Sequence, residues 1–138
     1  MFDRINNLVA KDGFTLLIWD DRYGKGVRAG LGIVHSDMDT VSSTSEDGDL
    51  DMTPAMEYVF SADWLPYVTG DSVADALSQL ETRLAKLPED QLTRDSLWST
   101  LTSQAIETLR TAYQEATDYS RLPASWADAI EQCVSQAE

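Results

Sequence analysis

Apolar residues in the second half of the chain recur every three or four positions, which is the spacing of one helix face. Ser72 and Asp75 can form an acidic variant of the capping box, and Pro88 ends the pattern. The pattern therefore predicts a helix over 72–87. The apolar positions of this stripe are Val73, Leu77, Leu80, Leu84 and Leu87.

Three further helices follow from the same spacing. A short one is predicted over 2–10, where Asp3 suits the positive end of the helix dipole and Asp12-Gly13 ends the periodicity. A longer one is predicted over 93–118, with Leu97, Leu101 and Ala105 on its apolar stripe. A last one is predicted over 125–136, capped by Ser125.

Three segments have the composition or alternation of strands. Residues 14–20 are rich in Phe, Thr, Ile and Trp, and a polar, glycine-containing connection joins them to 27–35. In 27–35, Val27, Ala29 and Leu31 alternate with Arg28, Gly30 and Gly32, and these glycines indicate close approach of another group. Residues 55–61 alternate again and predict a third strand.

The order of elements predicts an α+β fold. Consecutive strands joined by loops favour an antiparallel sheet, and the helices are segregated in the second half. We expect one domain over 1–138, with a sheet-forming half at 1–62 and a helical half at 71–138. The sequence leaves open whether the chain is a monomer or a dimer.

Residues 61–77, from Ser61-Ala-Asp-Trp-Leu-Pro-Tyr to Asp75-Ala-Leu, resemble the strand–turn–helix junction of HicB-like antitoxins. In that family an Asp-Leu-Pro-Gly turn and a Gly-Asp-Thr helix start follow a short meander. Here Trp64 is inserted and Tyr67 replaces the glycine. The resemblance covers about an eighth of the chain, in residues common to many turns and caps, and implies only the local geometry.

The charge of the chain and its distribution add more to this prediction than the overall composition does. The 138 residues carry 24 Asp and Glu against 10 Lys and Arg, for a net charge of −14. Residues 1–30 are nearly neutral, whereas residues 31–60 contain seven acids and no Lys or Arg. Such a chain is a poor direct ligand for nucleic acid or an anionic membrane, because phosphate binding needs clustered basic residues.

The sequence offers little for catalysis or cofactor binding. His35 is the only histidine and Cys133 the only cysteine, so a nucleophilic triad or a zinc site lacks partners, and no disulfide can form within the chain. Asp47, Asp49 and Asp51 begin like a calcium loop, but the following pattern lacks the glycine and the bidentate Glu. We expect no enzyme activity, no cofactor and no metal.

The lack of a signal peptide pattern and of a long apolar run predicts a cytoplasmic protein without a membrane segment. Three hypotheses account for the acidity: a protein that binds and inhibits a basic, nucleic-acid-binding partner protein, an adaptor acting through an apolar patch, and a salt-adapted domain. The first has the character of phage anti-restriction and anti-CRISPR proteins and of immunity proteins, which use nucleic-acid mimicry. The surface predicted to contact the partner comprises Asp37, Asp39, Glu46, Asp47, Asp49, Asp51, Trp64, Tyr67, Asp71 and Asp75.

Overall fold

The computed structural model describes residues 2–20, 26–33, 41 and 59–115. This part of the chain contains a three-stranded antiparallel sheet and helices, so the α+β class is confirmed. The elements are α1 (Asp3–Asp12), β1 (Thr15–Asp20), β2 (Val27–Gly32), β3 (Tyr67–Gly70), α4 (Val73–Ala85), the short 3-10 helix η1 (Glu89–Gln91) and α5 (Leu97–Glu115).

The sheet has the order β1-β2-β3, with β2 antiparallel to both neighbours. The prediction of a third strand at 55–61 is wrong for its described residues, because 59–61 are helical and β3 lies at Tyr67–Gly70. The alternation that suggested a strand placed Phe60 inside and Val59 outside, but Val59 is fully buried and Phe60 only partly. Four residues, of which only Thr69 is exposed, are too few to show a strand period.

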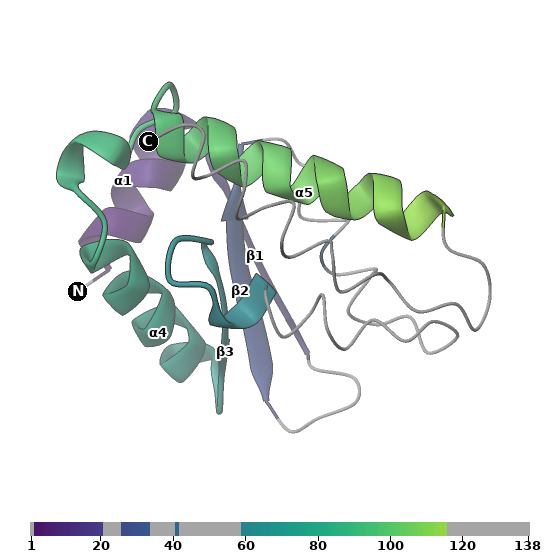
Figure 1. Ribbon diagram of the computed structural model, residues 1–138. Coiled ribbons are helices and arrows are strands. Elements are labelled where there is room, and N and C mark those ends of the chain that lie inside the picture. Colours follow the sequence, from purple (N-terminus) through teal and green to yellow (C-terminus); the bar gives the residue numbers. More distant parts are fainter. Residues whose placement is uncertain (1, 21–25, 34–40, 42–58, 116–138) are drawn as a thin grey trace.

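Helices α1 and α4 cover the same face of the sheet, while α5 begins near α1 and runs past the end of the sheet (Figure 1). Ala29 and Leu31 of β2 and Val68 of β3 meet Leu80 and Leu84 of α4 in the core. The alternation in 27–35 placed Ala29 and Leu31 on one face of the strand, and both are buried there. Their burial supplies the main driving force for placing α4 on the sheet.

Close approach of the backbone explains two of the glycines. On the face of the sheet opposite Ala29, Gly30 lies under the ring of its register partner Tyr67, and a β-carbon there would be 2.5 Å from that ring. At the end of β3, a β-carbon on Gly70 would be 2.4 Å from the backbone nitrogen of Ala76 in α4. The glycine lets the strand end and the helix start pack directly together.

Side chains of α4 cap two helices. Ser72 Oγ accepts the N–H of Asp75 at 3.1 Å, as predicted, and Asp75 Oδ2 accepts the N–H of Asp71 at 2.7 Å. Glu81 serves α1, whose own N-cap residue makes no side-chain cap. Its Oε1 accepts the N–H groups of Arg4 and Ile5 at 3.0 and 3.2 Å, and its Oε2 pairs with the Arg4 guanidinium at 3.3 Å.

Arg83 of α4 holds the segment that leads into β3. Its Nη2 donates to the carbonyl of Phe60 at 3.1 Å, and its Nη1 donates to the carbonyls of Leu65, at 3.2 Å, and Tyr67. Burial lowers the pKa of the Arg83 guanidinium below its ordinary value, and the nearby Asp63 carboxylate opposes this. One cation thus satisfies three backbone acceptors that lie outside any helical ladder.

Trp98 joins the start of α5 to the core. Its ring stacks on Phe14 with centroids 5.8 Å apart, its Nε1 donates to the carbonyl of Trp64 at 2.7 Å, and its backbone N–H donates to Gln91 Oε1. The helix begins at Leu97, four residues later than predicted, because residues 92–96 form bends and a turn after η1. The predicted helix at 125–136 lies outside the described residues.

We expect replacement of Arg83 by Met to lower the free energy of unfolding by about 3 kcal/mol, because three partly buried carbonyls lose a charged donor. Urea denaturation followed by circular dichroism measures the change. The matched control is Lys86→Met, which removes one charge from the exposed end of the same helix and should change stability by less than about 0.5 kcal/mol. Equal effects of both variants would contradict the assigned role of Arg83.

Glu81→Ala should lower the free energy of unfolding by about 1–2 kcal/mol, because the N–H groups of Arg4 and Ile5 in the first turn of α1 lose their carboxylate acceptor. Hydrogen exchange measured by NMR tests this locally: protection of the Arg4 and Ile5 amides should fall more than protection of Leu31 in β2. A uniform loss over both elements would instead indicate a general packing defect.

Candidate functional site

The acidic residues at the centre of the predicted site lie outside the described residues. This applies to Asp37, Asp39, Glu46, Asp47, Asp49 and Asp51, and also to His35 and Cys133. The contact surface that we predict for them stays a prediction. The remaining residues of the predicted site, at 64, 67, 71 and 75, can be placed.

The two aromatic residues predicted to anchor a partner lie inside the protein to different degrees. Tyr67 is 0% exposed in β3, with its ring over Gly30, so its prediction as a surface anchor is wrong. The sequence pattern suggested a connection between elements at this position. In the structure, Tyr67 is the first residue of β3 and pairs with Gly30 of β2. Trp64 is half-buried, and its carbonyl accepts the Trp98 indole N–H.

Asp71 and Asp75 lie together at the N-terminus of α4, as the capping pattern indicated. Asp75 is half-buried and its carboxylate accepts the N–H of Asp71, while Asp71 itself is exposed. Asp75 therefore stabilises the start of α4 whether or not a partner protein is bound. Glu81, a further acid on the same helix, is likewise engaged with α1.

The exposed charges of the described chain are mostly negative. Three basic residues are exposed there: Lys11, Lys86 and Arg94. Eight acidic residues are exposed: Asp3, Asp20, Asp63, Asp71, Glu89, Asp90, Asp95 and Glu107. The described exterior is thus acidic even without residues 34–58.

Four arginines and three acids of the described chain are partly buried. Arg4 pairs with Glu81, Arg83 binds backbone carbonyls, and the Arg28 guanidinium lies 4.3 Å from the centroid of the Phe60 ring. Arg110 pairs with Glu107 one turn earlier on α5. These contacts direct positive charge inward or against neighbours, which a count of residue types does not show.

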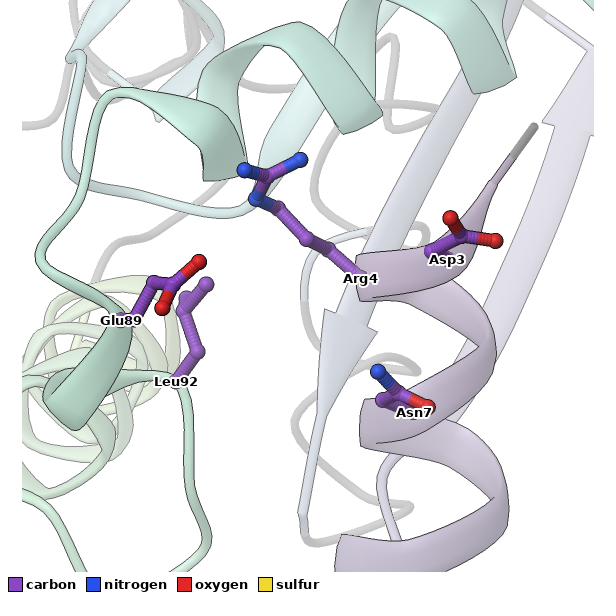
Figure 2. Close-up of a pocket in the computed structure, with 5 residues that line it drawn as sticks. All are labelled: Asp3, Arg4, Asn7, Glu89 and Leu92. Atoms are coloured by element: carbon purple, nitrogen blue, oxygen red, sulfur yellow. The ribbon is translucent and has the colours of Figure 1, made fainter.

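A cavity of about 380 Å³ lies between α1 and η1. Asp3, Arg4 and Asn7 line it from α1, and Glu89 and Leu92 face them from the other side (Figure 2). No sequence pattern indicates this cavity, because the two groups of residues are more than 80 positions apart and neither forms a motif. Its lining combines two carboxylates, a guanidinium, an amide and one apolar side chain.

The cavity lining suits recognition better than catalysis. The Arg4 guanidinium is already paired with Glu81 on α4, so it does not supply a separate cation for an anionic ligand. The five lining residues include no hydroxyl, thiol or imidazole that could act as a nucleophile or a neutral base. Within the described ranges, no group of three or more His, Cys, Asp and Glu is arranged to hold a metal ion.

Among the described helices, none is both long enough and apolar enough to cross a membrane. Residues 63–72 contain a turn, a short strand and a capped helix start, whereas the antitoxin junction that 61–77 resemble has its strand before the turn. No protein-family model, no curated protein and no solved structure matches the chain.

Proposed function

We propose that the protein acts without catalysis, by binding and inhibiting a partner protein that has a basic, nucleic-acid-binding surface. Its mode of action would be nucleic-acid mimicry, as in phage anti-defence, anti-CRISPR or immunity proteins, and its compartment the cytoplasm. The sequence places seven acids and no basic residue in 31–60. A concentrated negative surface attracts a positive one and raises the rate of association.

The observation that carries this proposal is the predominance of acids among the exposed charges of the described chain, eight acidic against three basic residues. Arg4 and Arg83 contribute to helix capping and to the support of β3, so their charge offsets little of the exposed negative charge. Asp71, which belongs to the proposed contact surface, is one of the exposed acids. The described surface is therefore negative, as the sequence of residues 37–51 is.

The structure changes which residues we include in the proposed contact surface. Tyr67 is removed because it is fully buried, and Asp71 is kept because it is exposed near Trp64 in the sequence. The alternative of an adaptor with an apolar patch receives less support. The large apolar residues exposed in the described part, Val9, Val73 and Leu97, lie on three different helices.

Replacing Asp47, Asp49 and Asp51 together by Asn should weaken binding of the basic partner and reduce the dependence of its affinity on salt. Each neutralised acid removes attraction that salt screens. The partner is first isolated by affinity capture from the native host and identified by mass spectrometry. Calorimetric titrations at about 50 and 300 mM salt then compare the two chains.

The matched control replaces Asp90, Asp95 and Glu107 by their amides, which changes the net charge equally at a described surface far along the chain from 37–51. We expect a loss of affinity at least about tenfold smaller than that of the first variant, if the contact is local. Affinity of the unmodified chain that does not change with salt would refute the proposal. Equal losses of affinity in both variants would indicate that the total charge, and not a local contact at 47–51, governs binding.

A further inference from the structure

Strand β1 forms one edge of the sheet and has unusually little protection for an edge. No strand of the described chain pairs with its outer side. From Thr15 to Ile18 it contains no charged residue, proline or glycine, and these side chains are half-buried. Edge strands of monomeric proteins commonly carry a Lys, a Pro or a bulge that discourages pairing with another chain.

The opposite edge of the sheet differs. Strand β3 has only four residues, and the carbonyl of Tyr67 already accepts a hydrogen bond from Arg83. Gly70 at its end packs against the start of α4. Short length and cover by a helix are two of the usual ways to blunt an edge, so the contrast singles out β1.

Charge indicates which occupant β1 accepts. The chain carries a net charge of −14, so two copies repel over most of their surface. Residues 1–30 contain five basic and four acidic residues, and Thr15–Ile18 lie within that nearly neutral part. Two copies therefore approach with least repulsion through the strand whose outer edge no described strand pairs with.

We propose that a second copy of this chain pairs antiparallel with β1, with the two-fold axis at Leu17. Residues opposite one another in an antiparallel pair share a face, so a two-fold axis must pass at a residue. With Leu17 opposite its copy, Leu16 lies opposite Ile18 on the side of α1 and α4, and Asp20 lies opposite Phe14. Centring on Leu16 would instead place Asp20 opposite Asp12.

This interface does not depend on the proposed function, and salt distinguishes the two. Binding of a basic partner weakens as salt rises, because the attraction is screened. Pairing of two acidic copies through neutral strands strengthens as salt rises, because their mutual repulsion is screened. A failure of one proposal therefore leaves the other untouched.

Sedimentation equilibrium of the full chain at about 50 and 500 mM salt tests the proposal. We expect a monomer–dimer equilibrium whose dissociation constant falls with salt. Leu17→Lys should raise that constant about tenfold or more, because two lysines then lie directly opposite each other. The control Val73→Lys adds the same charge at a site that is 51% exposed on α4, and dimerisation should persist.

A charge-pair experiment separates pairing from misfolding. Leu17→Lys and Leu17→Glu chains should each be mainly monomeric, and an equimolar mixture should form a heterodimer. In the unmodified chain, hydrogen exchange of residues 15–18 should slow as protein concentration increases. A monomer at both salt concentrations, a mixture that does not associate, or amides at 15–18 protected equally at every protein concentration would each overturn the proposal.

Discussion

The guanidinium of Arg83 connects three parts of the described fold that are separated in the sequence. It extends from the last turn of α4 to the segment before β3 and donates to the carbonyls of Phe60, Leu65 and Tyr67. Backbone carbonyls in a turn cannot be buried without donors, because each loses its hydrogen bonds to water. Arg83 therefore stabilises the turn before β3 against α4 by giving these carbonyls a charged donor.

Several charged side chains of the described fold have partners inside it. Glu81 caps α1 and also pairs with Arg4, so one acid and one base together hold α1 against α4. Arg28 lies over the Phe60 ring on the other face of the sheet. The remaining exposed charges are mostly acidic. The partly buried charges of the described chain include both signs, so they take little part in the acidic excess outside.

Local features of this fold were predictable from sequence, whereas long-range contacts were not. The Ser72–Asp75 cap and the glycine after α1 involve neighbouring residues with specific hydrogen-bonding or conformational properties. β3 was missed because four largely buried residues show no alternation. The cavity beside α1 and the roles of Glu81 and Arg83 join residues 16 to more than 80 positions apart, and no spacing rule reports such contacts.

The acids of the described chain fall into two groups with different consequences. Asp75 and Glu81 accept backbone N–H groups at helix starts, so they complement the helix dipole and their charge is partly neutralised where it lies. Exposed acids such as Asp90 and Asp95 have surroundings dominated by water, and their charge acts mainly at a distance through the summed field. Neutralising Asp75 or Glu81 lowers the stability of the fold. Neutralising the exposed acids mainly changes the attraction or repulsion between this protein and other charged surfaces. The nearly neutral β1 and the acidic remainder therefore favour opposite kinds of contact within one small protein.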